Sequence, residues 1–559
     1  MRNQRQRTLF EFAAARAARP PRSAPVVIDL EADEDSEHDT NDRPTPAQPI
    51  LIDDDDDDND DVATRVVAPV DPVGPAHQLE VEAKVSVAEL PLLKPASPKP
   101  SCPLCGVSLA ALELHLRELH CDQCADIKKT SPPLPKPKRP RKPLPPLPSV
   151  KKVHFRNFSI AVDGFNFADA PPISQYFLSH FHADHYIGLK KSWSQGAIYC
   201  STVTAQLLTL KLRVPPEIIV ELPLDTPFEI GPNVSVICLD ANHCPGATVF
   251  LFHETDHLDR SRTRQWVLHT GDFRSNNLLI DRILAYTHGE SIHKVYLDTT
   301  YMYPSYHFPL QPSVLQVTSE FAGQINEVGA RKLFNNRQSS ILSYVTASLS
   351  RRHIYNYVFV VGTYTIGKEK LAVAIAQWLD TKIFLPKDSP KDRIVQVYQH
   401  LLPQDIFTYD ITKACVHLVP MRTLSSKDSL NNYFKPIAHI YKDMIAFTPT
   451  GWTFSNGGRF VKLYETPQEK IDHTRALMQD AQVDKFNSEI IFKQYKPLAK
   501  FQVFKVPYSE HSSFKDLANF CIRVPWVQII PTVNTHNDYM VNQMKEWFST
   551  WKKIQSLNS

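Results

Sequence analysis

The sequence His-x-His-x-Asp-His places four metal-binding side chains within six residues: His180, His182, Asp184 and His185. An apolar run at 175–178 precedes them and predicts a β-strand, and a helix is predicted at 186–189. Side chains alternate in extended backbone, so the two histidines at 180 and 182 should point the same way. The Asp-His pair should lie at the start of the helix. This pattern predicts a clamp for one metal ion and ligands for a second, about 3.5–4 Å away.

Three later segments repeat the design of an apolar strand followed by a metal-binding side chain. They are 234–239 before His243, 265–268 before Asp272, and 295–297 before Asp298. Nearly continuous apolar runs are typical of strands covered on both faces. The ends of such strands would deliver ligands to one rim of a sheet, and each oxygen of Asp272 could bind one of two ions. The sequence therefore predicts a metal centre built from several strand ends.

The string 180–185 resembles the signature of the metallo-β-lactamase superfamily, and Asp163, 17 residues before His180, resembles its first motif. From Asp298 onward the motifs resemble those of a smaller group within this superfamily. Asp298-Thr299-Thr300-Tyr301, residues 506–513 and residues 529–534 resemble the β-CASP nucleases, and among these the DNA cross-link repair 5′-exonucleases. The similarity spans roughly residues 155–550. A lone Asp-Gly pair at 163–164 is otherwise typical of a turn.

The resemblance implies an α/β fold, a metallo-β-lactamase αββα sandwich with an inserted β-CASP cap domain. It also implies two ligand sets: His180, His182, His243 and Asp272 for one metal, and Asp184, His185, Asp272 and His511 for the second. These nitrogen and oxygen donors suit one or two zinc ions. By the same resemblance Asp163 would orient the metal-binding loop. Asp298 would either hydrogen-bond a ligating histidine or assist proton transfer.

The implied activity is that of a metal-dependent phosphodiesterase, a 5′-to-3′ exonuclease for 5′-phosphorylated DNA in interstrand cross-link repair. A water activated by the metals would attack the phosphorus. The implied catalytic residues are Asp163, Asp184, Asp272, Asp298 and His511. Val533 stands where RNA-processing relatives typically carry histidine, which favours DNA. An RNA-processing endonuclease and a non-catalytic repair scaffold are the alternatives.

A turn after the predicted strand 357–361 is a candidate anion site, because free backbone N–H groups at a helix start attract anions. It is not a Walker loop, since Glu369 follows Lys368 where that motif needs Ser or Thr. We expect the substrate's 5′-phosphate to bind near this turn, and ordinary helix capping is the alternative. The candidate phosphate-binding residues are Thr363, Thr365, Lys368, Ser509, Ser512 and Ser513.

The first 150 residues are rich in proline and carry 25 acidic and 19 basic side chains, against 35 and 43 in the remainder. With little hydrophobic periodicity, this region predicts a disordered tail. Residues 6–12 resemble a sliding-clamp-binding box. Residues 26–31 and 50–53 are aliphatic triplets followed by acids and resemble SUMO-interaction motifs, which bind by strand addition. A solvated acidic linker is the alternative.

Cys102, Cys105, His120 and Cys124 form a complete tetrahedral ligand set for one structural zinc, and His115 and Cys121 are alternative ligands. The pattern resembles the ubiquitin-binding zinc finger of DNA-repair proteins. A DNA-binding finger is disfavoured, because the segment between the outer cysteines has one arginine, no lysine and three acids. Ubiquitin, SUMO and the sliding clamp are thus expected partners beside DNA.

A basic, proline-rich stretch around 136–142 predicts a nuclear import signal or a DNA-tethering arm. No apolar run is long enough to cross a bilayer, so we expect a nuclear protein without a membrane partner. Of the nine cysteines, the five after residue 150 are expected to be reduced and buried. The expected segments are 1–98 (tail), 99–126 (finger), 127–152 (linker), 153–301 and 504–559 (metallo-β-lactamase domain), and 302–503 (β-CASP domain).

Overall fold

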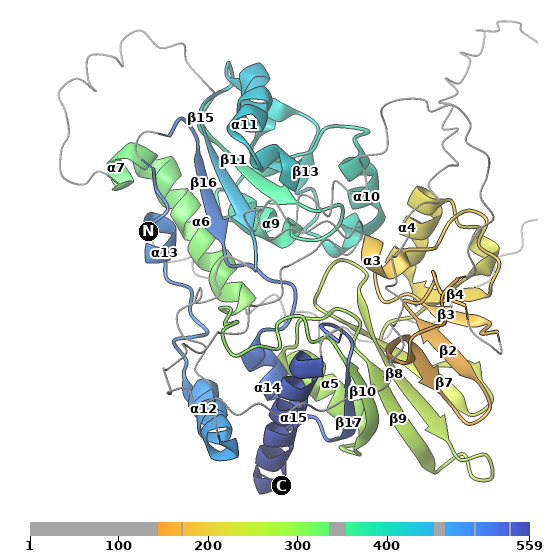
Figure 1. Ribbon diagram of the computed structural model, residues 1–559. Coiled ribbons are helices and arrows are strands. Elements are labelled where there is room, and N and C mark those ends of the chain that lie inside the picture. The colour runs from red at the N-terminus through yellow and green to blue at the C-terminus, as the bar shows by residue number, and fades with distance from the viewer. Residues whose placement is uncertain are drawn as a thin grey trace, which may run out of the picture. The chain divides into compact units, whose positions relative to one another are not determined.

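The computed structural model describes residues 144–168, 172–334, 354–451, 464, 466–496, 499–535 and 538–558. All of them lie in one compact unit, Leu109–Ser559. The zinc finger, the docking motifs and most of the basic linker lie outside the described residues and stay predictions, as do the six segment boundaries. The described chain forms three β-sheets with helices packed on them (Figure 1).

Two sheets build the part of the chain that carries the His-rich motif. The first has the order β1 (Lys152–His154), β2 (Ser159–Val162), β3 (Gln175–Phe177), β4 (Ala197–Ser201), β5 (Ile219–Leu222). The second has the order β17 (Trp526–Pro531), β10 (Ile292–Leu297), β9 (Thr263–His269), β8 (Thr248–Thr255), β7 (Val234–Asp240), β6 (Phe228–Gly231). Side chains from both sheets share one buried apolar cluster, in which the rings of Phe177 and Phe252 lie 5.3 Å apart. The sheets therefore pack face to face, as in a sandwich.

The third sheet is parallel throughout. Its order is β13 (Phe407–Thr408), β12 (Lys382–Phe384), β14 (Ala414–Pro420), β11 (Tyr355–Thr363), β15 (Tyr441–Pro449), β16 (Gln502–Val506). The predicted strand 357–361 is confirmed as the middle of β11. β11 is buried from Val358 onward, as expected because parallel sheets are normally covered on both faces. Helices α6 (Gln311–Val328) and α9 (Glu369–Trp378) pack on this sheet.

The third sheet is an insertion into the second. Strands β10 and β17 are parallel neighbours, with Val295 opposite Ile529, although the entire third sheet lies between them in the sequence. The chain leaves the second sheet at Leu297, builds the third sheet, and returns through β16 and α14 (Phe514–Arg523). We refer to the inserted segment 302–506, which ends with β16, as the cap. The strand that ends the cap leads directly into the loop that carries His511.

The remaining helices are α3 (Ala183–Tyr186), α4 (Thr202–Leu212), α5 (Asn277–Thr287), α7 (Ala330–Phe334), α10 (Pro390–Tyr398), α11 (Lys427–Phe434), α12 (Pro467–Gln479), α13 (Glu489–Phe492) and α15 (Asp538–Asn558). Within the described residues, six short 3-10 turns lie at Ser149–Lys151, Pro216–Ile218, Gln399–Leu401, Ile411–Lys413, Met421–Leu424 and Lys435–Ile437. In Figure 1, α5, α14 and α15 lie beside β10 and β17. Among the described helices, none combines the length and apolar character needed to cross a bilayer.

The predicted strands 234–239, 265–268 and 295–297 are confirmed as parts of β7, β9 and β10. The predicted helix at 186–189 is wrong, because α3 covers only Ala183–Tyr186. Gly188 follows at φ +101°, where a Cβ would lie 2.5 Å from the Phe165 carbonyl oxygen. This close approach bends the chain away before a second helical turn can form. The five cysteines within the described residues are free and buried, as predicted.

Candidate metal centre

The loop between β3 and α3 carries the His-rich motif. β3 ends at Phe177, so His180 and His182 lie in the loop rather than in the strand. Their ring nitrogens nevertheless converge, with His180 Nε2 2.8 Å from His182 Nδ1. His243, which follows β7, completes the group, with its Nε2 3.1 Å from the same His182 nitrogen. Three imidazole nitrogens thus face one small volume.

Asp272, after β9, lies between this group and two further histidines. Its Oδ2 lies 3.8 Å from His180 Nε2, 3.3 Å from His185 Nε2 and 3.9 Å from His511 Nε2. Within the described residues, three sets of side chains could each hold an ion: His180, His182 and His243; His180, His185 and Asp272; and His243, Asp272 and His511. Asp272 belongs to two of them. The donor set, imidazole nitrogen and carboxylate oxygen, fits zinc and similar divalent metals.

Asp184 lies at the edge of this arrangement. Its Oδ2 is 3.6 Å from His185 Nε2, but its side chain is 66% exposed and it belongs to none of the three sets. Its part as a ligand stays a prediction. The other six predicted ligands are brought together by the fold.

Each of the five histidines has its second ring nitrogen engaged by a fixed partner. The partners are Ser179 Oγ for His180 (3.0 Å), the Ile366 carbonyl for His182 (3.3 Å), the Glu510 carbonyl for His243 (2.8 Å), Asp163 for His185 (2.8 Å) and Asp298 for His511 (2.9 Å). Such partners fix the ring orientation and tautomer of a metal-binding histidine. The inward nitrogens are therefore free to bind a cation.

Asp163 orients the His-rich loop. It follows β2 at φ +53° and is 3% exposed. Its carboxylate accepts hydrogen bonds from the Ser179 backbone N–H (2.8 Å) and hydroxyl (2.7 Å) in addition to His185. Burial alone would raise the pKa of Asp163, but the charge and hydrogen bond of His185 and the nearby Lys151 lower it to about 2. Asp163 is therefore an anion that holds two loop positions at once.

Asp298 orients His511 through a hydrogen bond, as Asp163 orients His185. The carboxylate, 1% exposed, also accepts the Thr300 N–H (2.9 Å) and hydroxyl (2.6 Å). Burial would raise its pKa, but His511 and these hydrogen bonds lower it. Of the two roles considered for Asp298, this geometry favours holding a ligating histidine.

The charge state of the histidines follows from their surroundings. Burial and the neighbouring imidazoles hold the pKa values of His180 and His243 well below the usual range, so both rings are neutral. Burial would also lower the pKa of His185, but Asp272, Asp184 and Asp163 raise it well above the usual range. Burial would likewise lower the pKa of His511, but Asp298 and Asp272 raise it. The neutral rings of His180 and His243 suit a metal ion better than protons, because imidazolium groups this close together would repel one another.

The candidate phosphate-binding residues are mostly engaged within the protein. Lys368 is 7% exposed, and its ammonium donates to the Tyr508 carbonyl (3.2 Å) and lies 3.7 Å from Glu510. The hydroxyls of four others have internal partners: Thr363 with Val419, Ser509 with His511, Ser512 with Phe273 and Ser513 with Asp516. Thr365 is exposed. Direct phosphate contact by these residues stays a prediction.

Sequence reasoning missed three contributors to the site. Glu510 and Ile366 act through backbone carbonyls, which residue type does not reveal. Arg274 is 3% exposed and donates to the Ser509 carbonyl (2.9 Å), the Pro309 carbonyl (3.0 Å) and Asp516 (3.2 Å). It therefore ties the loop after β9 to the loop that carries His511. Its position two residues after Asp272 was the available signal.

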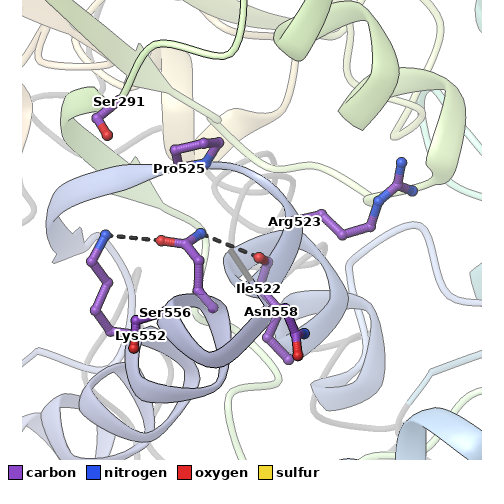
Figure 2. A pocket seen from close by; sticks show the side chains of 8 residues that line it. Ser291, Ile522, Arg523, Pro525, Lys552, Ser556 and Asn558 are labelled. Carbon is purple, nitrogen blue, oxygen red and sulfur yellow. Dashed lines mark hydrogen bonds between the residues drawn. The ribbon is translucent and has the colours of Figure 1, made fainter.

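A separate pocket of about 550 Å³ lies at the ends of α14 and α15. Lys552, labelled with Ile522 in Figure 2, donates a hydrogen bond to Gln555, and the Gln555 amide donates to the Ile522 carbonyl (3.2 Å). The Gln555 amide also donates to the Cys521 and Val524 carbonyls. These bonds satisfy the C-terminal carbonyls of α14, so the polar lining serves to join two helices.

Comparison with known proteins gives consistent matches. Residues 402–537 match the family model of the DNA repair metallo-β-lactamases. The chain is 37% identical to the DNA cross-link repair protein PSO2/SNM1 of Saccharomyces cerevisiae, over 81% of this chain and 77% of that protein. It is 32% identical to the human DNA cross-link repair 1A protein, over 72% of this chain and 32% of that protein. It is 29% identical to the chicken 5′ exonuclease Apollo, over 67% and 62% respectively.

Proposed function

Because the chain belongs to the DNA repair metallo-β-lactamase family of cross-link repair proteins, we propose that it digests DNA from ends that carry a 5′-phosphate. The protein is a metal-dependent nuclease of cross-link repair. The observation that carries the finer proposal is the cluster in which Asp272 lies 3.3–3.9 Å from His185, His180 and His511. A relative named as a 5′ exonuclease supports the 5′ polarity.

The proposed ligands are His180, His182, His243 and Asp272 for one ion, and Asp184, His185, Asp272 and His511 for a second, with zinc as the proposed metal. When bound, the ions would lower the pKa of the attacking water and stabilise the leaving 3′ oxygen. Asp163 and Asp298 hold His185 and His511 so that their Nε2 atoms face Asp272. The chain thus holds the proposed ligand side chains in fixed positions after strand ends. Side chains that are already in place need little rearrangement during the reaction.

The polarity is tested with single-stranded DNA labelled at its 3′ end and carrying either a 5′-phosphate or a 5′-hydroxyl. We expect a ladder of labelled fragments that shortens from the 5′ end, at least about tenfold faster with phosphate, which corresponds to about 1.4 kcal/mol. RNA of the same sequence should be cut much more slowly. Preferential RNA cleavage would support the endonuclease alternative, and digestion from the 3′ end or no preference for phosphate would contradict the proposal.

Further proposals concern the N-terminal region, which lies largely outside the described residues. We propose that Cys102, Cys105, His120 and Cys124 bind a structural zinc and present a ubiquitin-binding surface, and that the tail docks on SUMO and the sliding clamp. Nuclear location is proposed from the basic linker and from relatives named as DNA repair proteins. The six segments given above are the proposed domain division.

A further inference from the structure

The turn 364–368 of the cap contacts the ligand histidines directly. The Ile366 carbonyl accepts the outer N–H of His182 at 3.3 Å. Two residues later, the backbone N–H of Lys368 donates to Glu510 Oε1 at 2.9 Å. The backbone carbonyl of Glu510 in turn accepts the outer N–H of His243 at 2.8 Å. Through this chain of bonds, two ligands of one ion are held by the cap turn and by Glu510.

The Glu510 carboxylate is well placed to fix the turn. It is 3% exposed, so water does not compete for its bonds. It meets the start of α9, where Lys368 occupies the N-cap position at φ +71° and no side chain of the helix itself caps the free N–H groups. The Lys368 ammonium lies 3.7 Å from Oε2. An anion at a helix N-terminus is favoured by the helix dipole, and here a carboxylate from outside the helix supplies it.

Gly367 lets the turn approach this closely. It has φ +97°, and a Cβ there would lie 2.9 Å from Glu510 Oε2 and 3.4 Å from Cys244 Cβ. A side chain at this position would displace either the carboxylate or the turn. The contact between the cap and the ligand loops therefore depends on glycine at 367 and glutamate at 510.

We propose that Glu510 is a positioning residue that couples the cap to metal binding. Its carboxylate holds the turn so that the Ile366 carbonyl meets His182, while its own carbonyl holds His243. It touches neither the ion nor the substrate. This inference rests on the proposed metal centre, and it predicts that loss of the carboxylate weakens binding of the ion shared by His180, His182 and His243.

Glu369 offers a matched control. It is a second buried carboxylate on the same helix start, 2% exposed, and it pairs with Lys391 and accepts the Tyr398 hydroxyl at 2.7 Å. Its side chain makes no bond to any ligand histidine among the described contacts. Removal of either glutamate takes the carboxylate away from a lysine that is at most slightly exposed, Lys368 or Lys391, and should destabilise the fold. Only removal of Glu510 should also affect metal binding.

The test is a zinc titration of metal-free protein against a chromogenic chelator, with thermal melts in parallel. The wild type, Glu510→Ala, Glu510→Gln and Glu369→Ala are compared. We expect Glu510→Ala to weaken zinc about tenfold or more, the usual effect of losing an outer-shell partner. Glu510→Gln, which keeps an oxygen acceptor for the Lys368 N–H, should recover most of the affinity. Glu369→Ala should bind zinc within about threefold of the wild type.

Equal zinc affinity in Glu510→Ala and the wild type would overturn the inference and leave the nuclease assignment standing. An equal loss in Glu369→Ala would overturn it too, because the effect would then come from general loosening of the cap. A wild type that binds no zinc would remove the proposed centre itself. If Glu510→Ala does not fold, Gly367→Ala replaces it: we expect weaker zinc binding there, and unchanged binding would contradict the proposal.

Discussion

Asp272→Asn is expected to lower kcat/KM for DNA hydrolysis by about 1,000-fold or more. Asp272 is the carboxylate common to two of the three candidate ligand sets in the described chain, with Oδ2 3.3 Å from His185 and 3.9 Å from His511. An amide carries no charge and is a poor ligand, so several kcal/mol of metal-dependent stabilisation should be lost. A 1,000-fold loss corresponds to about 4 kcal/mol. The measurement is single-turnover digestion of end-labelled DNA.

Asp281→Asn is the matched control for this substitution. Asp281 lies on α5, its side chain is 61% exposed, and it pairs with Arg523 at the surface. The same chemical change there should leave activity within about twofold, since isolated surface ion pairs contribute little. Wild-type activity in Asp272→Asn, with both proteins folded, would remove Asp272 from the proposed mechanism.

Metal removal should have an equally large effect. Dialysis against a strong chelator is expected to abolish nuclease activity and to lower the thermal midpoint by several degrees. An ion that binds only the folded state stabilises it by about 4 kcal/mol at a thousandfold excess over its Kd. Added zinc should restore both properties. The measurement is differential scanning fluorimetry in parallel with the digestion assay.

The stability effect has its own control. Zinc should raise the midpoint of metal-free Asp272→Asn less than that of the metal-free wild type, because one shared ligand is missing. Activity that persists in protein verified to be metal-free would contradict the account. So would a midpoint that does not respond to zinc.

The candidate ligands His243 and Asp272, and Asp298 beside them, were predictable because each follows a recognisable strand. The apolar runs before His243, Asp272 and Asp298 are strands β7, β9 and β10, and their carboxyl ends lie at one edge of the second sheet. His511 was identified only through the resemblance. Its strand, β16, belongs to the inserted sheet, and strand pairing between distant segments is not visible in local patterns.

Only some of the hydrogen-bond partners of the histidines could be predicted from the sequence. Asp163 and Asp298 are charged side chains at recognisable positions, whereas Ile366 and Glu510 contact His182 and His243 through backbone carbonyls. Any residue type supplies a carbonyl, so sequence alone could not identify these two. The length of α3 was misjudged for a related reason. The approach of Gly188 to the Phe165 backbone is a tertiary contact, and it overrides local helix propensity.

Lys368 illustrates how burial changes an interpretation. In the sequence it reads as an exposed lysine at a helix start, typical of anion binding. In the structure its ammonium is directed toward Glu510 and the Tyr508 carbonyl. A residue that pairs with an internal carboxylate can position the site without contacting the substrate. The phosphate comparison and the zinc titration, each repeated with Lys368→Ala, would separate these two roles.

Side chains scattered from 163 to 511 are proposed to form one dinuclear hydrolytic centre. The most direct measurement is an anomalous difference map from crystals of the zinc-loaded protein at the zinc absorption edge. We predict one peak bounded by the ring nitrogens of His180, His182 and His243, and a second beside Asp272, His185 and His511. Zinc-loaded crystals with no peak among these residues, or with zinc only elsewhere on the chain, would contradict the claim.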